Sequence, residues 1–507
     1  MEFNPLEERP LTPQEQRDID PSGKARAHLA SLQHAQWPPH PTPMSFNAPS
    51  FDKSYDFIQA FRRKYFDNPK HEVYYVWEET YDKKWARQGG SVPLRVLRPM
   101  IEASYARAIP LRLDPLLIKA RDYFVKLIRE RKDRLGIPAY ACNRITGTVG
   151  GLPMWERKGS FLAETVGFSE FRRLYPDVPG TRYQYAKPRL IHMDATANVR
   201  MADAPLTTAR NWLKTAFPEY FSAWMDPSDT LKPKITSAIE CNSYSTEWDY
   251  ESMDIGFGPQ IAEELIMPIY EEILPNDLYN QLNWYVSQMF DQPMFLGTTM
   301  LTGTHTLWSG VNPTNDFETL YSVIIHIASQ IALGVLHQET VAAFIGDDAV
   351  VGYRNASLSR DILETVISLS ASAGEIISVV KSRAGVNDFQ FCRNLYYKCG
   401  RRDRGVIVGA YPYIRAWQSC VAPERRADSV AQVYAGQLAR LDNCYGAPHW
   451  HNFVQQVAKV LFADLNKIDP AELQIPSDWR QRVLGTRWTP SSSPTYRWWA
   501  AERGIQF

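Results

Sequence analysis

Two adjacent carboxylates lie between short apolar runs in the stretch 341–353, which reads Val-Ala-Ala-Phe-Ile-Gly-Asp-Asp-Ala-Val-Val-Gly-Tyr. Apolar runs on both sides of a Gly-Asp turn are typical of a tight β-hairpin. Such a turn would set Asp347 and Asp348 at a strand tip, where the two anions repel each other and a divalent cation is the natural compensation. A plain surface turn also uses Gly and Asp. The metal hypothesis therefore requires a third carboxylate from elsewhere in the chain.

A second acidic stretch, residues 245–254, reads Ser-Thr-Glu-Trp-Asp-Tyr-Glu-Ser-Met-Asp and supplies candidate partners for that pair. Asp249 and Asp254 are separated by four residues. One of them can end a strand while the other opens the segment that follows. On local grounds alone, a polar surface loop is a fair alternative.

Basic residues precede this acidic stretch, in the sequence Tyr-Ala-Lys-Pro-Arg-Leu-Ile-His at 185–192. Lys187 and Arg189 are two positions apart, so on a strand they share one face. Two cations side by side repel each other unless an anion, such as a triphosphate, lies between them. An ordinary exposed edge strand, which commonly carries Lys, is the alternative.

A glycine-rich stretch at 146–160 reads Thr-Gly-Thr-Val-Gly-Gly-Leu-Pro-Met-Trp-Glu-Arg-Lys-Gly-Ser. Its glycines would let the backbone approach a ligand closely, and its Arg-Lys pair could meet a phosphate. A plain loop would look similar, so this stretch is a weak signal when it is taken alone.

A further loop lies in 308–320, where Ser309 and Gly310 precede a proline. Thr314 or Asn315 can cap the apolar helix that follows. The structural interpretation is a capped helix start. The functional interpretation is a loop that lines a substrate groove together with the start of the helix.

The 507-residue chain is 44% hydrophobic and 22% charged, which is a globular composition with ample material for a core. Its formal net charge is zero, so a nucleic-acid partner would need a local basic lining. The six cysteines form no CxxC pair, which argues against a zinc site and fits a reducing, intracellular setting. The apolar stretch 320–336 is interrupted by polar residues, so it predicts a buried helix and no membrane span.

The remaining patterns place these stretches among helices and a few strands. The proline-rich residues 1–50 predict an extended arm, and residues 51–135 predict helices, one of which starts at an Asp114 cap. The other predicted elements are, in chain order, an amphipathic helix (361–373), a strand that ends in Lys381 (376–381), a strand pair (388–397), two helices (427–441 and 451–465) and a Trp-rich tail (488–507).

The order of these signals is more specific than any one of them. A basic strand, an Asp-x4-Asp segment, a Ser-Gly-x3-Thr loop, a Gly-Asp-Asp hairpin, a lysine-tipped strand and a basic strand pair follow one another. In this order the chain resembles the viral RNA-dependent RNA polymerases over roughly residues 146–400, about half of its length. Its length, the loop before Pro153 and the segment Lys187-Pro-Arg189 look most like the partitivirus and picobirnavirus group of bisegmented double-stranded RNA viruses.

The resemblance implies a role for each acidic residue. Asp249 and Asp347 would be ligands of two Mg²⁺ ions about 3.5–4 Å apart, with Asp348 an auxiliary carboxylate. The ions, for which Mn²⁺ can substitute, would lower the pKa of the primer 3′-hydroxyl and stabilise the leaving pyrophosphate. Lys381 would be the general acid for pyrophosphate. Asp254 would sense the ribose 2′-hydroxyl, which separates RNA from DNA substrates.

The resemblance also implies contacts to the nucleotide, the template and the primer. Lys187 and Arg189 match the basic segment that neutralises the triphosphate. Ser309, Gly310 and Thr314 match the loop that follows the template and closes on the nucleotide. The contacts to template and primer would be made by Thr146, Gly150, Pro153, Gly310, Cys392 and Arg393.

One position departs from the family pattern. Many related polymerases have Asn nine residues after the loop serine, whereas this chain has Glu318 there. Asn315 lies three residues earlier and shares a helix face with Glu318. The residue that helps Asp254 to read the 2′-hydroxyl is therefore left open, with Asn315 the leading candidate.

The implied fold class is α+β, a right-hand polymerase with an antiparallel palm sheet and helix-rich fingers and thumb that touch to enclose the site. The implied partners are RNA template and product, NTPs and a viral capsid protein, with no membrane. The implied location is the virion interior or the host cytoplasm. The expected boundaries are residues 1–50 for a Pro-rich arm, 51–240 and 260–298 for the fingers, 241–259 and 299–400 for the palm, and 401–507 for the thumb and tail.

Three other classes compete with this hypothesis. Fifteen Trp, 26 Tyr and many carboxylates could build the cleft of a glycoside hydrolase, but such an enzyme has no use for the basic residues. A non-catalytic nucleic-acid or capsid-binding protein on the same fold stays open, although the intact acidic residues argue against it. A reverse transcriptase usually needs a bulky residue where Asp254 stands.

Overall fold

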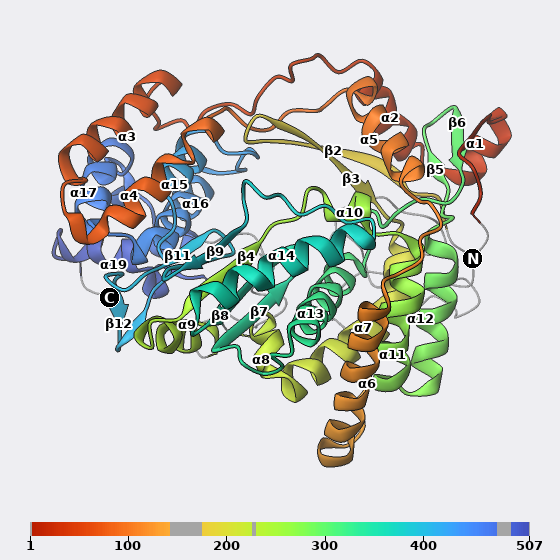
Figure 1. Cartoon of the computed structure of the whole chain (residues 1–507). Coiled ribbons are helices and arrows are strands. Elements are labelled where there is room, and N and C mark those ends of the chain that lie inside the picture. Colours follow the sequence, from red (N-terminus) through yellow and green to blue (C-terminus); the bar gives the residue numbers. More distant parts are fainter. Residues whose placement is uncertain (1–2, 142–174, 226–229, 474–487, 506–507) are drawn as a thin grey trace.

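The computed structural model describes residues 3–141, 175–225, 230–473 and 488–505. Helices surround several small antiparallel sheets (Figure 1). Within the described ranges, no helix combines the length and the apolar character that are needed to cross a bilayer. The helices are α1 (Pro13–Ile19), α2 (Lys24–Gln33), α3 (Phe51–Tyr65), α4 (Glu72–Glu79), α5 (Leu94–Ala106), α6 (Pro115–Leu135), α7 (Thr196–Ala216), α8 (Pro218–Phe221), α9 (Leu231–Glu240), α10 (Met253–Gly256), α11 (Met267–Ile273), α12 (Asn276–Met289), α13 (Thr314–Leu333), α14 (Ala356–Ser372), α15 (Tyr413–Val421), α16 (Val430–Asp442), α17 (Trp450–Leu461) and α19 (Pro494–Ala501).

The central sheet has four antiparallel strands in the order β7-β8-β4-β9. β7 (Val341–Ile345) and β8 (Asp348–Tyr353) form the hairpin that the sequence predicts. β4 (Tyr244–Trp248) pairs with β8 on one side and with β9 (Arg383–Val386) on the other. The acidic stretch that contains β4 and the Gly-Asp-Asp hairpin are therefore neighbours in one sheet.

Helix α13 is the buried core helix predicted from the apolar stretch. It contacts β7 and α14, and α14 in turn contacts β4 and β9. Its polar interruptions His326, Ser329 and Gln330 are all buried. Ser329 donates a hydrogen bond to His326 O (2.7 Å), and Gln330 donates to Glu339 Oε2 (2.5 Å). Internal hydrogen bonds thus let Ser329 and Gln330 lie inside an apolar core.

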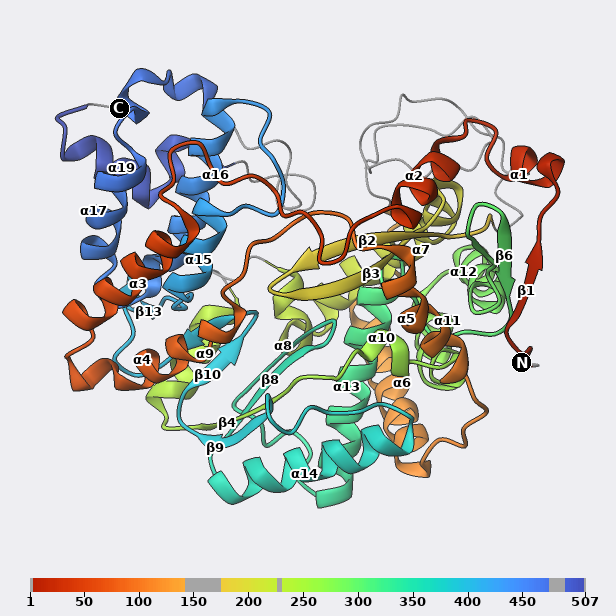
Figure 2. The same cartoon turned by 90° about the horizontal axis from the view of Figure 1, so that it is seen from above.

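A ribbon of two strands, β2 (Val178–Gln184) and β3 (Lys187–Met193), carries the basic segment. Figure 2 shows this ribbon running from the side of α5 toward the side of α15 and α16. A three-stranded sheet, β1-β6-β5, lies near the end of the ribbon on the α5 side. The other strands are β1 (Glu7–Pro10), β5 (Met294–Phe295), β6 (Thr299–Thr302), β10 (Phe389–Phe391), β11 (Asn394–Tyr396), β12 (Arg402–Asp403) and β13 (Val406–Ile407).

The proline-rich arm lies on the body of the protein, but it is not extended throughout. Its strand β1 pairs with β6, and two short helices, α1 and α2, follow. The arm then crosses to the C-terminal helices (Figure 2), where Ser45 N donates to Val421 O (2.9 Å). Prolines forbid long helices but allow a helix start, and Pro13 opens α1.

The apolar side chains form two large cores. One joins the central sheet to α5, α6, α7 and α11 to α14. The other joins α3 and α4 to α15, α16, α17 and α19, with Phe61 packed edge-on against Tyr413. Helices α3 and α4 therefore share a core with residues 395–500, although the sequence-based boundaries group them with residues up to 240.

The predicted strand over 376–381 is wrong. Only Ile377 makes a bridge there, to Tyr250, and the chain turns at Val379 and Val380. The side chains of these two valines are 69% and 91% exposed. β-Branched residues favour strands where neighbours cover them, and here the strand of the region, β9, begins only after the turn.

Other local predictions are confirmed. Asp114 caps α6 by accepting a hydrogen bond from Leu116 N (2.8 Å). The strand pair predicted over 388–397 is the β10–β11 hairpin. The three predicted later helices correspond to α14, α16 and α17.

Candidate active site

The turn of the β7–β8 hairpin presents Asp347 at one end of the central sheet. Ile345 and Asp348 are paired across the hairpin, so Gly346 and Asp347 form its two-residue loop. Gly346 has a φ of +56°, a left-handed conformation that glycine adopts at no steric cost. The turn geometry thus accounts for the glycine of the Gly-Asp-Asp sequence.

Helix α13 fixes the backbone of this turn. The hydroxyl oxygen of Thr319 accepts a hydrogen bond from Gly346 N (2.7 Å), and the hydroxyl of Ser322 donates to Gly346 O (3.3 Å). Both side chains are buried. Sequence reasoning gave them no role. The available signal was two hydroxyl residues, three positions apart, on one face of a largely apolar helix.

Asp249 follows β4 directly and lies at the same end of the sheet. Trp248 is paired with Ala349 in the β4–β8 ladder. One step further along each strand, the antiparallel register sets Asp249 beside Asp348. The carboxylates of the two predicted acidic stretches are therefore brought together by strand pairing.

Lys381 joins this group from the turn before β9. Its Nζ forms an ion pair with Asp249 Oδ1. The backbone supports the arrangement, because Asp249 N donates to Ser382 Oγ (3.2 Å) and Ser378 N donates to Asp249 O (2.8 Å). The structure thus places Lys381 beside Asp249, although no strand presents it.

Burial and mutual repulsion raise the pKa of the carboxyls at this sheet end. Burial, followed by the charge of Asp249, raises the pKa of Asp347. Burial, followed by the charge of Asp347, raises the pKa of Asp348 to about 7. The ionised forms of Asp347 and Asp348 are therefore unfavourable in this site, and a bound cation would stabilise them.

The chemistry of the donors fits a divalent cation. Among the described residues, no three His, Cys, Asp or Glu side chains are gathered into a ready-made metal-binding group. Lys381 is paired with Asp249, and the thiol of Cys392 is hydrogen-bonded to Asp348. Mg²⁺ is commonly held by one or two carboxylates together with substrate phosphates. Asp249 and Asp347 therefore suit a metal that binds with its substrate.

Asp254 lies in the first turn of α10, within electrostatic range of Asp347. Both of its candidate partners come from α13. A Cβ placed on Gly346 would be 3.0 Å from Asn315 Nδ2 and 3.4 Å from Glu318 Oε2. Burial, followed by the charges of Asp347 and Asp254, raises the pKa of Glu318 well above its usual range. Both partners thus border the hairpin turn, and Glu318 interacts electrostatically with Asp254.

The loop of Ser309 and Gly310 is attached to strand β3. His192 N donates a hydrogen bond to Ser309 O (2.8 Å). Gly310 has a φ of +115°, and a Cβ there would clash with the His192 carbonyl oxygen. Only glycine therefore allows this approach of the loop to the basic strand.

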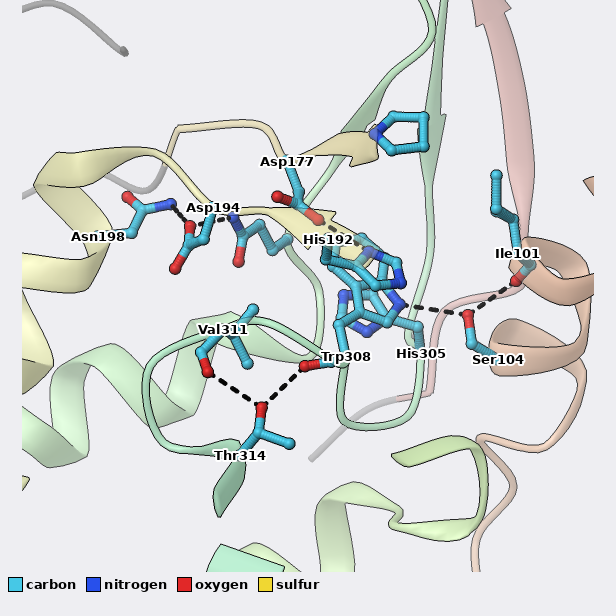
Figure 3. Close-up of polar contacts among 12 residues, drawn as sticks. Ile101, Ser104, Asp177, His192, Asp194, Asn198, His305, Trp308, Val311 and Thr314 are labelled. Atoms are coloured by element: carbon cyan, nitrogen blue, oxygen red, sulfur yellow. Dashed lines mark hydrogen bonds and ion pairs between the residues drawn. The ribbon is translucent and has the colours of Figure 1, made fainter. Parts of the chain in front are cut away.

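The predicted helix cap by Thr314 or Asn315 is wrong. Thr314 is the first residue of α13, and the preceding position makes no side-chain cap. Its hydroxyl donates instead to Trp308 O (2.8 Å) and Val311 O (3.0 Å), as Figure 3 shows. Thr314 thus closes the loop that leads into the helix.

A stack of rings holds this loop against the ribbon (Figure 3). Trp308 stacks on His192 with ring centroids 4.4 Å apart and on His305 at 3.5 Å. His192 Nδ1 is 2.8 Å from Asp177 Oδ2. Burial lowers the pKa of both histidines to about 3, so both rings are neutral and pack as flat plates. No feature of the sequence predicted this stack.

Strand β3 carries the two predicted basic residues, and one of them, Arg189, is close to the acidic sheet end. Lys187 begins the strand and is exposed, and Arg189 follows on the same face. Burial and the charges of Arg393 and Arg182 lower the pKa of Arg189, while the charge of Asp347 raises it. Arg189 is therefore within electrostatic range of the hairpin turn.

The β10–β11 turn adds Cys392 and Arg393 to the site. Both have left-handed backbones, with φ of +48° and +64°, which is uncommon for residues other than glycine. The charge of Arg393 lowers the pKa of Asp347. This pair of predicted primer contacts is thus close to the carboxylates. The other predicted template contacts, Thr146, Gly150 and Pro153, lie outside the described residues.

A clasp centred on Glu424 joins the ribbon to the C-terminal helices. Arg182 donates to both carboxylate oxygens of Glu424, at 2.5 and 2.8 Å, and Gln184 donates to the same group (3.2 Å). Thr42 of the N-terminal arm donates to Glu424 O (2.7 Å). Three segments that are far apart in the sequence are thus held together at one residue.

Glu424→Gln is expected to loosen this clasp by about 1 kcal/mol, because a two-point ion pair between partly exposed groups becomes a neutral contact. Amide hydrogen exchange over residues 178–193 should then become about fivefold faster. As a control, Glu102→Gln removes a surface ion pair with Arg98 inside α5 and should leave the ribbon unchanged. Equal exchange in both variants would mean that the clasp does not restrain the ribbon.

Comparison with known proteins identifies the fold of the chain. No protein-family model and no curated protein matches the chain. The crystal structure of the RNA-dependent RNA polymerase of a human picobirnavirus matches with a TM-score of 0.72 and 16% identity, over 97% of this chain and 99% of that one. The chain has the fold of a viral RNA-dependent RNA polymerase. An insertion-loop deletion mutant of a human picobirnavirus polymerase also matches, with a TM-score of 0.72, 16% identity, and coverage of 98% and 100%.

The polymerase fold extends over nearly the whole chain, beyond the residues 146–400 from which the resemblance was drawn. An α+β fold with antiparallel sheets among many helices is confirmed. At 16% identity, most positions differ from those of the solved polymerase. The resemblance rests on the order of a few acidic, basic and glycine residues, whereas the overall sequence carries little of it.

Proposed function

We propose that this chain is an RNA-directed RNA polymerase that performs template-directed, two-metal nucleotidyl transfer. The primer 3′-oxygen would attack the α-phosphorus of an NTP, and the bond to pyrophosphate would break. The observation that carries the proposal is the meeting of Asp249, Asp347 and Lys381 at one sheet end, inside a polymerase-like fold. Arg189 and Arg393 supply the positive charge that a triphosphate needs.

Asp249 and Asp347 would hold Mg²⁺, with Asp348 as an auxiliary carboxylate. When bound, the ions would lower the pKa of the 3′-hydroxyl and stabilise the leaving pyrophosphate. Mn²⁺ shares the preference for oxygen ligands and is expected to substitute. The raised pKa values of Asp347 and Asp348 support this proposal, because burial and the neighbouring carboxylates disfavour the charged forms that a bound cation would stabilise.

The other residues would position the nucleotide. Lys187 and Arg189 would neutralise the triphosphate. Asp254 would accept a hydrogen bond from the ribose 2′-hydroxyl, assisted by Asn315 or Glu318 beside it. The loop of Ser309, Gly310 and Thr314 would follow the template, together with the glycine-rich residues Thr146, Gly150 and Pro153.

Lys381→Leu is expected to slow nucleotide incorporation by about a hundredfold while the apparent NTP affinity changes little, since general acids contribute on this scale to the chemical step. The Lys381 ammonium would give a proton to the departing pyrophosphate oxygen. Single-nucleotide incorporation, followed in the pre-steady state over a range of NTP concentrations, separates rate from affinity. Lys381→Arg keeps the charge beside Asp249 but gives up protons poorly, so it should remain slow. A normal rate with weaker NTP affinity would refute the general-acid role.

The likeness to viral polymerases supports a right-hand layout and viral partners. RNA template and product and NTPs would be its ligands, a viral capsid protein its partner, and the virion interior or host cytoplasm its location. The core that α3 and α4 share with the C-terminal helices argues for grouping them with the thumb. The proposed regions are otherwise the fingers (51–240 and 260–298), the palm (241–259 and 299–400) and the thumb with its tail (401–507).

The test is synthesis itself. The purified chain, given a short single-stranded RNA, four NTPs and Mg²⁺, should make template-length RNA. Product that requires all four NTPs and the RNA would establish the polymerase. No product, even with Mn²⁺ and an annealed primer, together with tight RNA binding, would favour a non-catalytic binding protein on this fold.

A further inference from the structure

A cluster of cations without acidic partners borders the carboxylates. Among the described residues, Lys84, Arg189, Arg393 and Arg415 take part in no ion pair, whereas Lys381 is paired with Asp249. The four come from four different segments, so only the fold gathers them. Sequence reasoning assigned nothing to Lys84 and Arg415.

Lys84 and Arg415 are held near each other by one aromatic ring. Lys84 Nζ lies 5.0 Å from the ring centre of Tyr81, and the Arg415 guanidinium lies 5.3 Å from the same centre. Arg415 also lies over Tyr185, at 4.1 Å, at the tip of the β2–β3 ribbon. Cation–π contacts of this kind orient a charged group without neutralising it.

The charges of the cluster affect one another, which confirms that they are close. Burial, followed by the charges of Arg415, Arg393 and Lys381, lowers the pKa of Lys84 to about 8, although the charge of Asp249 acts in the opposite direction. Arg415 is only 4% exposed, and its Nε has no hydrogen-bond partner. A nearly buried guanidinium with an unsatisfied donor, beside other cations, is costly unless an anion binds there.

Two strained turns bring the cluster together. Tyr185 and Ala186, at the tip of the ribbon, have φ of +53° and +59°, and Cys392 and Arg393 share this left-handed conformation. Such backbones cost free energy in residues other than glycine, and they cluster at functional sites. Here the first turn places Tyr185 on Arg415, and the second presents Arg393 to the carboxylates.

We propose that Lys84 and Arg415, together with Arg393, form a binding subsite for RNA backbone phosphate, which holds the 3′ end of the growing strand. This inference rests on the proposed polymerase function. Lys84 and Arg415 share the ring of Tyr81, and Lys84 is within electrostatic range of Asp249. Arg189 comes from the ribbon and is within electrostatic range of Asp347. Lys84 therefore suits a phosphate of the product strand on the Asp249 side, whereas Arg189 suits the phosphates of the incoming NTP.

The experiment compares Lys84→Gln with Lys83→Gln, the adjacent exposed lysine for which no contact to the site is found in the described chain. Fluorescence anisotropy would measure the affinity for a labelled RNA primer–template duplex, without nucleotide or metal, at several salt concentrations. Lys84→Gln should bind roughly fivefold more weakly, with a salt dependence reduced by about one phosphate contact. Lys83→Gln should bind as the unchanged protein does, and Lys84→Arg should restore the affinity.

Steady-state NTP kinetics separate the two sources of phosphate. A raised KM for NTP with unchanged duplex affinity in Lys84→Gln would overturn the assignment to the product strand. Duplex affinity and KM that both equal those of Lys83→Gln would overturn the subsite itself. Failure of the proposed function gives a different result. If the unchanged protein binds no RNA duplex, the polymerase proposal itself is contradicted before any variant is compared.

Arg415→Lys provides a second, independent variant. It retains the charge but loses the flat stacking of the guanidinium on Tyr185 and Tyr81. Duplex affinity should fall severalfold while the thermal midpoint stays close to that of the unchanged protein. Normal duplex affinity in a folded Arg415→Lys would exclude Arg415 from the subsite.

Discussion

Asp347→Asn is expected to reduce template-directed synthesis by at least about a thousandfold, the scale on which loss of a preorganised electrostatic group acts. The amide fits the same hairpin turn but lacks the charge that would hold a divalent cation beside Asp249. Template-length product from a single-stranded RNA, measured with Mg²⁺ and with Mn²⁺, provides the readout. Synthesis at a normal rate would show that Asp347 has no catalytic role.

The same variant should be as stable as the unchanged protein, or more stable, when divalent cations are absent. Burial and the charge of Asp249 raise the pKa of Asp347 in the folded state. A raised carboxyl pKa means that the charged form destabilises the fold, so stability is lost as the pH rises through the folded-state pKa. The gain in the thermal midpoint of Asp347→Asn should therefore be clear at pH 8 and should shrink toward pH 3.8, the usual pKa of the group.

Added Mg²⁺ or Mn²⁺ gives a control on this thermal measurement. A bound ion that needs the Asp347 carboxylate should raise the midpoint of the unchanged protein and leave Asp347→Asn unaffected. An equal rise in both proteins would mean that the ion binds elsewhere. This comparison does not depend on enzymatic activity, so it tests the metal proposal separately from the polymerase proposal.

Gly310→Ala is expected to reduce synthesis by about a hundredfold, since a shift of about 1 Å in a positioning loop has effects of that size. The added methyl group would clash with the carbonyl oxygen of His192, and the φ of +115° is itself unfavourable for alanine. The loop would therefore move away from β3, which carries Arg189. Primer extension at saturating NTP is the measurement.

Gly405→Ala is the matched control for this clash. Gly405 also has a positive φ, +84°, but a Cβ there would have no atom within 4 Å. Alanine at this position bears the backbone strain alone, about 1–2 kcal/mol, without displacing a neighbour. Gly405→Ala should lose some stability and retain synthesis. A similar loss of synthesis in both variants would trace the effect to general destabilisation rather than to the loop.

The hairpin and several helices could be predicted because their signals are local. Apolar runs around Gly346 and Asp347 allow little else than a tight hairpin, and Asp114 before a proline marks a helix start through its own hydrogen bond. The residue types at the site were also accessible, since the order of the carboxylates and cations resembles that of viral polymerases. These features depend on neighbours in the chain, which the sequence lists directly.

Predictions failed where the neighbours are distant. The run at 376–381 has strand-forming residues, yet it turns, because no strand covers Val379 and Val380. Thr314 has the composition of a cap, yet its hydroxyl binds the carbonyls of the preceding loop. In both cases, long-range packing overrides a correct local preference.

The sequence by itself determined the local elements, the acidic and basic residue types, and the order that resembles viral polymerases. Only the tertiary structure decided which charges meet. The β4–β8 register sets Asp249 beside Asp348, and Lys84 and Arg415 meet at Tyr81 although 330 positions separate them. The reason is physical: electrostatic and packing energies depend on distance in space, and no local pattern encodes which distant residues a fold brings within reach.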